Sequence, residues 1–152
     1  MNSIIQWNCR GFKANFDELS LLVNEKKPVA ICLQETFLKD NDSLSLKYHS
    51  CYHKTSDASA RACGGVAIFV NNSVPHSLVS LTTILQATAV RISLSKTITL
   101  CSLYLPPSQP LDTDKLVELV NQLPPFMIVG DFNSHNTLWG WDVETPIKKA
   151  NY

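Results

Sequence analysis

Five side chains that carry oxygen stand at or just beyond the ends of four apolar segments in this sequence. They are Asn8, Glu35, Tyr104, Asp131 and Asn133. Asp131 and Asn133 are two residues apart, a spacing at which extended backbone directs both side chains to the same side. Carboxylate, amide and phenol oxygens suit a hard cation such as Mg²⁺, which binds one or two carboxylates together with water and phosphate oxygens. The pattern therefore predicts a site for metal-assisted phosphodiester hydrolysis.

The reaction gives each of these groups a role. We expect Glu35 to bind the metal, with Asn8 as a second contact to it. Asp131 would orient or deprotonate the attacking water. Asn8, Asn133 and the Tyr104 hydroxyl would hold phosphate oxygens as negative charge builds. Three further side chains are candidate contacts to phosphate or DNA, namely Arg10, Arg61 and His135.

Other chemistries lack their signature residues. The sequence has no Gly-x-Ser-x-Gly segment of a serine hydrolase and no glycine-rich phosphate loop. Its five cysteines include no Cys-x-x-Cys pair, which argues against a disulfide framework or a zinc ribbon. Thirteen basic and thirteen acidic side chains give a net charge of zero. That balance argues against a general nucleic-acid clamp, but not against a site that grips one phosphate.

The elements that position these groups are short strands and two amphipathic helices. A helix is expected to begin after Asn15, which stands three residues before Glu18 as in a capping box, and to end before Pro28. A second helix is expected over 112–123. Apolar or alternating runs predict strands at 3–7, 29–34, 48–54, 65–70, 87–94, 97–104 and 126–130. This order predicts one domain, 1–152, of the mixed-sheet α/β class, with ligands at the carboxyl ends of the strands.

The chain shows no sign of a membrane or secretory segment. No apolar run approaches the ~18–20 residues that a membrane span needs. The first residues include neither a charged leader nor an apolar signal core. We therefore expect a nuclear or cytoplasmic protein.

Five segments, in order, resemble the endonuclease/exonuclease/phosphatase superfamily, and within it the apurinic-endonuclease-like domains of jockey-type non-LTR retrotransposons. They are Trp7-Asn8-Cys9-Arg10-Gly11, Gln34-Glu35-Thr36, 64–70, 102–107 and Gly130-Asp131-Phe132-Asn133. The resemblance implies a partial four-layer α/β sandwich of the DNase I-like type, and it places the five oxygen-bearing residues at family active-site positions. It also implies Mg²⁺-dependent nicking of DNA, with Mn²⁺ as a substitute. In such elements a reverse transcriptase on the same polyprotein copies the element RNA from the nick.

The resemblance covers residues 3–142, and the family's domain continues beyond them. A later Asp and a closing Ser-Asp-His motif of the family have no counterpart here, and no histidine in this sequence follows an Asp. We therefore expect a C-terminally truncated domain with one sheet and only the beginning of the other. Such a domain would leave an apolar face open and would be defective in catalysis by itself.

Two alternatives remain open. The chain could be a phosphatase-type member of the same superfamily, which phosphate release from inositol phosphates would separate from nicking of supercoiled plasmid. It could also be a non-catalytic fragment or binding module that keeps the pocket without the chemistry. Metal-dependent nicking that is lost in Glu35→Ala and Asp131→Ala would reject this second alternative.

Overall fold

The computed structural model describes residues 2–56, 63–107 and 109–133. Its strands form two four-stranded mixed sheets, in the orders β1-β2-β4-β3 and β5-β6-β7-β8. The pairs β1–β2 and β7–β8 are parallel and the other neighbours are antiparallel. The elements are β1 (Ile4–Asn8), α1 (Phe16–Lys26), β2 (Ala30–Gln34), β3 (His49–Lys54), β4 (Val66–Asn71), β5 (His76–Val79), β6 (Gln86–Ser93), β7 (Thr97–Tyr104), α2 (Thr113–Val120) and β8 (Phe126–Asp131).

The two sheets pack face to face because alternate residues of each strand point between them. The apolar residues buried there come from both sheets, and they form the central core. They are Ala30, Cys32, Ile68, Val70, Val74, Val90, Ile92 and Leu100. The expectation of one sheet and only the beginning of another understated the second sheet. In the described residues the second sheet has four strands, as many as the first, and its inner face is covered by the first sheet.

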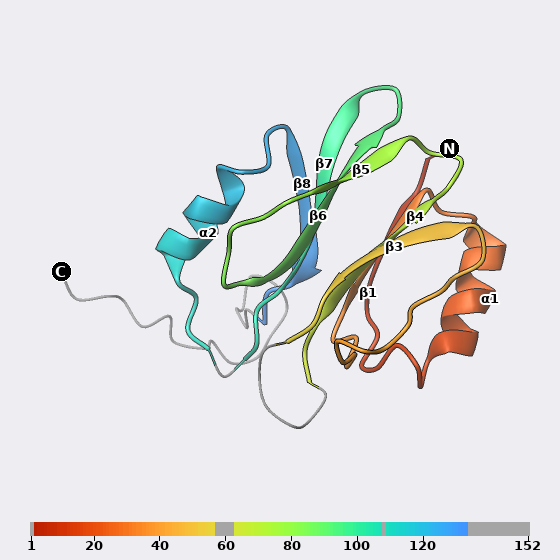
Figure 1. Cartoon of the computed structure of the whole chain (residues 1–152), viewed down its shortest axis with the longest axis horizontal. Coiled ribbons are helices and arrows are strands. Elements are labelled where there is room, and N and C mark those ends of the chain that lie inside the picture. The colour runs from red at the N-terminus through yellow and green to blue at the C-terminus, as the bar shows by residue number, and fades with distance from the viewer. Residues whose placement is uncertain (1, 57–62, 108, 134–152) are drawn as a thin grey trace, which may run out of the picture.

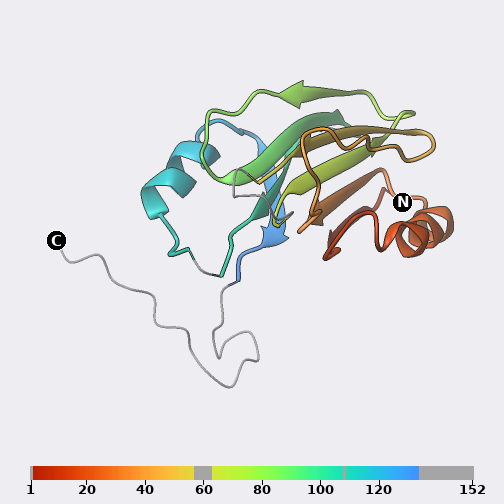
Figure 2. The same cartoon turned by 60° about the horizontal axis from the view of Figure 1, so that its bottom comes forward.

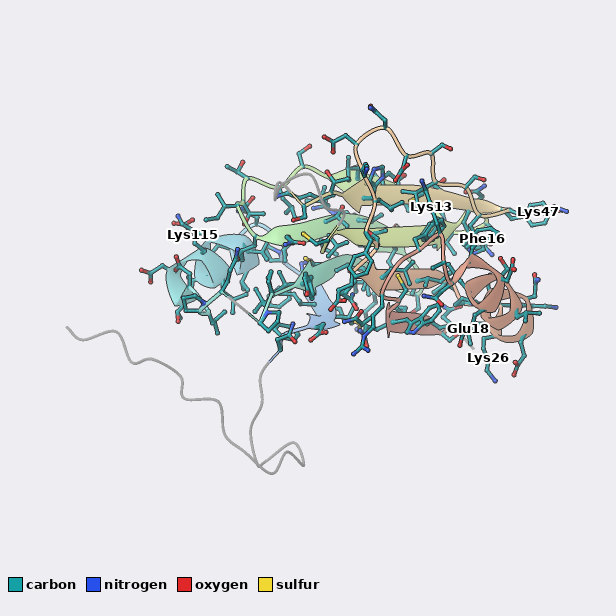
Figure 3. The ribbon with its side chains drawn as sticks, turned by 90° about the horizontal axis from the view of Figure 1, so that it is seen from below. Lys13, Phe16, Glu18, Lys26, Lys47 and Lys115 are labelled. Carbon is teal, nitrogen blue, oxygen red and sulfur yellow. The ribbon has the colours of Figure 1, made fainter. Side chains whose placement is uncertain are left out.

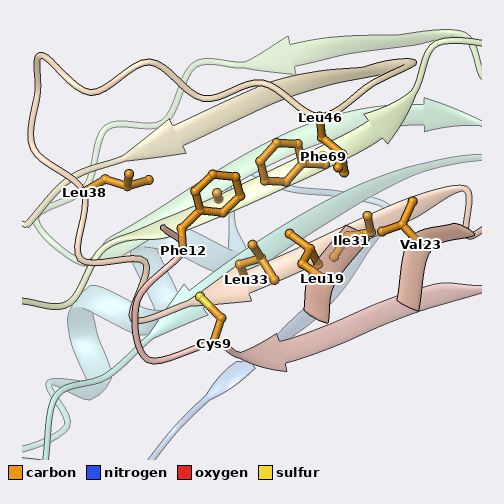
Figure 4. Packing of buried hydrophobic residues seen from close by; sticks show 10 residues of the cluster. Cys9, Phe12, Leu19, Val23, Ile31, Leu33, Leu38, Leu46 and Phe69 are labelled. Atoms are coloured by element: carbon orange, nitrogen blue, oxygen red, sulfur yellow. The ribbon is translucent and has the colours of Figure 1, made fainter. Parts of the chain in front are cut away.

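A helix covers the outer face of each sheet. Leu19 and Val23 of α1 pack on the outward residues of the β1–β4 sheet, where the rings of Phe12 and Phe69 also stack with centroids 5.5 Å apart (Figure 4). Leu119 of α2 is buried on the outer face of the other sheet. The helices lie at opposite ends of the view in Figure 1, with the sheets between them. The result is the expected α/β sandwich of four layers.

The start of α1 differs from the capping box that the sequence predicts. The side chain of Asn15 makes no cap hydrogen bond to the helix. Its amide nitrogen instead donates to the carbonyl oxygens of Cys9, at 2.7 Å, and Gly11, at 3.3 Å. Asn15 therefore fixes the turn that follows β1. At α2 the side chain of Asp112 does cap the helix, because it accepts from the backbone N–H of Lys115 at 3.1 Å.

Two further element boundaries differ from expectation. No strand is predicted at 76–79, where the structure has β5, which is only four residues long and half exposed. The second helix ends at Val120, three residues before the predicted end. Within the described ranges, no helix is long and apolar enough to cross a membrane.

Candidate active site

The five oxygen-bearing residues meet at one lip of the sandwich, where β1, β2, β7 and β8 end. Asn8 and Gln34 are register partners at the ends of the parallel strands β1 and β2. Tyr104 and Asp131 are the corresponding partners at the ends of β7 and β8. In Figure 2 the arrowheads of β1 and β8 lie beside each other on this side of the molecule. Each sheet therefore contributes the carboxyl ends of one parallel pair of strands to the site. Ligands in α/β sheets are expected at such ends.

The side chain of Asn8 joins the two acidic residues of the site. Its Nδ2 atom donates to Oε1 of Glu35 at 2.9 Å and to Oδ2 of Asp131 at 2.6 Å. The two carboxylates are thus separated by a single nitrogen atom, although they belong to different sheets. The Oδ1 atom of Asn8 lies 3.4 Å from the backbone nitrogen of Arg10. In this arrangement Asn8 orients the carboxylates through its nitrogen.

Glu35 owes its orientation to an unusual backbone conformation just after β2. Its φ angle is +52°, a left-handed conformation that non-glycine residues adopt at a cost of about 1–3 kcal/mol. Flanking hydrogen bonds hold it there. The carbonyl of Glu35 accepts from the N–H of Gly11 at 2.7 Å, and the N–H of Phe37 donates to the carbonyl of Gly64 at 2.9 Å. The turn that carries Glu35 is therefore fixed on both sides by neighbouring loops.

Asp131 and Asn133 come together for a reason other than the one that the sequence suggests. Extended backbone was expected to align them, but β8 ends at Asp131 and Asn133 has a φ of +43°. The chain turns back, so that the backbone N–H of Asn133 donates to Oδ1 of Asp131 at 2.9 Å. The amide of Asn133 donates to the carbonyl of Leu105 at 2.7 Å. Asn133 therefore anchors Asp131 to the end of β7.

The glycine before Asp131 allows a close approach between two strands. A Cβ atom at Gly130 would overlap the backbone carbonyl of Leu103 in β7. Only glycine fits at this point without movement of the backbone. Asp131 is thereby held against the end of the neighbouring strand.

Tyr104 is buried beside both carboxylates and is 7% exposed. The pKa of its phenol is raised to about 12, first by burial and then by the negative charge of Glu35 and a hydrogen bond with that carboxylate. The charge of Asp131 acts in the same direction, whereas a hydrogen bond with Asn133 lowers the pKa. The phenol is therefore protonated at neutral pH and can act as a hydrogen-bond donor.

The acidic pair has no basic partner among the residues that the structure describes. The described salt bridges join Lys13 to Asp42, Lys26 to Glu25 and Lys115 to Glu118. Figure 3 shows Lys13 and Lys26 near α1 and Lys115 on α2, at the other end of the molecule. The described residues also include no group of three or more His, Cys, Asp and Glu side chains placed to hold a metal. Two carboxylates with adjacent amide and phenol oxygens fit a hard cation that keeps most of its water, such as Mg²⁺.

The three predicted phosphate contacts have different outcomes. Arg10 is exposed and lies two residues after Asn8, with a φ of +45° that turns the chain away from β1. Its place beside the site is compatible with a phosphate contact. Arg61 and His135 lie outside the described residues.

Three polar residues next to the site were not predicted from the sequence as functional candidates. Gln6, Gln34 and Ser102 form a hydrogen-bonded chain between the sheets, directly behind the two carboxylates. Ser102 could have been predicted from the alternation of side chains along a strand, because Ser102 and Tyr104 must point to the same side of β7. Gln34 is also polar at the end of an otherwise apolar run, where an unpaired amide would be costly.

Comparisons with known proteins agree with the resemblance seen in the sequence. Residues 5–148 match the Endonuclease/Exonuclease/phosphatase family. The chain is 26% identical over 141 residues to the "Probable RNA-directed DNA polymerase from transposon X-element" of Drosophila melanogaster, covering 90% of this chain and 16% of that protein. It is 24% identical over 138 residues to the "RNA-directed DNA polymerase from mobile element jockey" of the same species, covering 88% of this chain and 15% of that protein.

A solved structure shows the same fold. It is the "Endonuclease domain of TRAS1, a telomere-specific non-LTR retrotransposon", which superposes with a TM-score of 0.74 at 22% identity. The match covers 93% of this chain and 65% of that domain. The chain thus spans about two thirds of the solved domain and a much smaller part of the two polymerases. The expected partial sandwich of the DNase I-like type is confirmed.

Proposed function

Because this chain belongs to the endonuclease/exonuclease/phosphatase family, we propose that its site hydrolyses phosphodiester bonds of DNA with a bound divalent cation. The similarity to two retrotransposon polymerases supports DNA as the substrate. It also supports a place in a polyprotein whose reverse transcriptase copies the element RNA from the nicked strand. One structural observation carries the proposal. Two carboxylates from different sheets share the amide nitrogen of Asn8, and neither has a basic partner among the described residues.

The cation, Mg²⁺ or Mn²⁺, would neutralise charge on the phosphate and lower the pKa of water. Glu35 would hold the cation, and Asn8 would make a second contact to it. Asp131 orients the attacking water. The phenol of Tyr104 and the amide of Asn133 donate to phosphate oxygens as their negative charge grows.

We expect the hydrolysis to be slow in this chain. The sequence contains no Ser-Asp-His segment, which the family resemblance gives as the source of its general base. A positioned general base contributes about 10²–10⁴-fold to a rate. Turnover should therefore fall short of a domain with that base by a factor in this range.

The test is the conversion of supercoiled plasmid to open circles by the purified chain, with Mg²⁺ and with a chelator. Nicking should require the metal and should disappear in Asp131→Asn and Glu35→Gln. The matched control is Asp114→Asn, since Asp114 is an exposed carboxylate in the first turn of α2. It should nick at the wild-type rate.

Two results would contradict the proposal. Phosphate release from inositol phosphates without any plasmid nicking would favour the phosphatase-type alternative. Metal binding without hydrolysis of either substrate, at protein concentrations in large excess over DNA, would favour a binding module.

A further inference from the structure

The side chains between the sheets change from apolar to polar along the strands toward the site. Ile4 in β1, Cys32 in β2 and Leu100 in β7 belong to the apolar core. Two residues further along each strand stand Gln6, Gln34 and Ser102, which we call the polar layer. The active site begins at the next step, with Asn8, Glu35 and Tyr104. The polar layer therefore separates the apolar core from the groups that would do the chemistry.

Hydrogen bonds run through the polar layer from the first sheet to the second. The Nε2 atom of Gln6 donates to Oε1 of Gln34 at 2.5 Å. The Nε2 atom of Gln34 donates across the interface to Oγ of Ser102 at 2.9 Å. The hydroxyl of Ser102 then donates back to the carbonyl of Leu33 in β2 at 3.1 Å. Gln34 and Ser102 are both 0% exposed, so their contact is enclosed between the sheets, whereas Gln6 on the edge strand is exposed.

Both ends of this bridge are joined covalently to site residues. Gln34 directly precedes Glu35, and its carbonyl accepts from the N–H of Cys9, the residue after Asn8, at 3.0 Å. Ser102 lies two residues before Tyr104, which is itself the register partner of Asp131. A shift at the Gln34–Ser102 contact would therefore move Glu35 and Asn8 relative to Tyr104 and Asp131.

We propose that Gln34 and Ser102 are positioning residues, whose hydrogen bond sets the offset between the sheets at which the two halves of the site meet. This inference deepens the proposed function and rests on it. Apolar contacts in the core hold the sheets together but have no strong directional preference. A buried hydrogen bond has a defined length and angle, and a buried donor that misses its acceptor is costly. The bridge thus selects one of several offsets that the apolar core would tolerate.

The test replaces both partners at once, in Gln34→Met/Ser102→Ala. Replacing both members of a buried hydrogen bond by apolar groups can leave stability nearly unchanged, so the double variant should fold. Ser102→Thr keeps the hydroxyl and serves as the conservative variant. Val90→Ala weakens the apolar part of the same core without touching the polar layer, and it is the matched control for a purely structural effect.

Two measurements report on the geometry of the site. The first is the affinity for Mn²⁺, followed by electron paramagnetic resonance of the free ion. Loss of groups that orient metal-binding side chains typically weakens metal binding by about 10–100-fold, and we expect that loss in the double variant. The second is the side-chain amide proton resonance of Asn8 in the metal-free chain, assigned by comparison with Asn8→Asp. Because Nδ2 of Asn8 donates to Glu35 at 2.9 Å and to Asp131 at 2.6 Å, this resonance should move toward that of a solvent-exposed amide when the two halves of the site shift apart.

The outcomes separate this inference from the proposed function. Weaker Mn²⁺ binding and a shifted Asn8 amide resonance in the double variant, with wild-type behaviour in Ser102→Thr and in folded Val90→Ala, support a positioning role. An unchanged Asn8 amide resonance in the double variant overturns it, whatever the Mn²⁺ affinity. If the wild-type chain binds no Mn²⁺, the metal-dependent function fails, and the Asn8 resonance still decides whether the bridge sets the site geometry.

Discussion

The amide nitrogen of Asn8 lies 2.6 Å from a carboxylate oxygen of Asp131, although 123 positions separate the two residues in the sequence. Asn8 ends the edge strand of one sheet, and Asp131 ends the edge strand of the other. The contact can form only when both sheets have been built and packed together. The candidate site is therefore a property of the whole sandwich, and substitutions there should report on both chemistry and folding.

Asn8→Asp should destabilise the metal-free protein. The substitution removes a donor to two carboxylates and adds a third negative charge between them. Hydrogen bonds to charged groups contribute about 1.5–3 kcal/mol, so the free energy of unfolding should fall by at least that amount in urea denaturation. Asn41→Asp, at an exposed loop position, should change it by less than about 0.5 kcal/mol. Equal effects of the two variants would show that Asn8 does not bridge the pair.

Mg²⁺ should stabilise the folded chain. An ion at 100 times its dissociation constant contributes about 2.7 kcal/mol if it binds only the folded state. For a chain of this size that corresponds to a rise in melting temperature of about 2–4 °C for each kcal/mol. The rise should vanish in Glu35→Gln and Asp131→Asn. A full rise in these two variants would place the ion elsewhere.

Tyr104→Phe should change how stability depends on pH on the alkaline side. The folded-state pKa of Tyr104 is raised to about 12, above the value of about 10 for an unfolded tyrosine. The stability linked to its protonated phenol is thus fully present below about pH 10 and is lost as the pH rises toward about 12. Wild-type protein should lose stability more steeply than Tyr104→Phe over this interval. Parallel curves from denaturation at a series of pH values would contradict the raised pKa.

Arg10→Ala should weaken DNA binding without weakening metal binding. If Arg10 contacts one phosphate, its removal should reduce the slope of log affinity against log salt concentration by about 1. Fluorescence anisotropy of a labelled duplex measures this slope, with Asp131→Asn as the background that prevents cleavage. Lys96→Ala is the control, because Lys96 is exposed in the turn between β6 and β7, at the other end of these strands from the site. A slope change of the same size in Lys96→Ala would point to non-specific charge effects.

The sequence was sufficient to predict the strand ends that build the site. Asn8, Glu35 and Tyr104 each end or follow a run of apolar or alternating residues, and the parallel pairs bring such ends to one lip. The sequence could not show how Asn133 reaches Asp131. That contact depends on a left-handed residue after the strand, which no alternation of side chains reveals.

Two remaining differences, at β5 and at Asn15, have causes local to each segment. β5 is short, and Leu78 within it is largely exposed, so it lacks the apolar pattern by which strands are found. The expectation of an incomplete second sheet had another source, the family resemblance, in which the domain continues beyond the matched residues. Asn15 likewise fits a helix cap by its spacing, but its amide is used by the turn after β1 because that turn leaves two carbonyls within its reach.

The alternation along β7 makes this strand sensitive to deletions of a single residue. Ser102 and Tyr104 face inward, whereas Cys101 and Leu103 pack on the outer side near α2. Loss of one codon inside β7 would exchange the two sets and send the phenol to the wrong side of its sheet. Loss of one residue in the turn at 95–96 would shorten the hairpin loop, and the side chains of β7 would keep their inward and outward directions. Among related sequences, single-residue deletions should therefore be found in the turn and not within the strand.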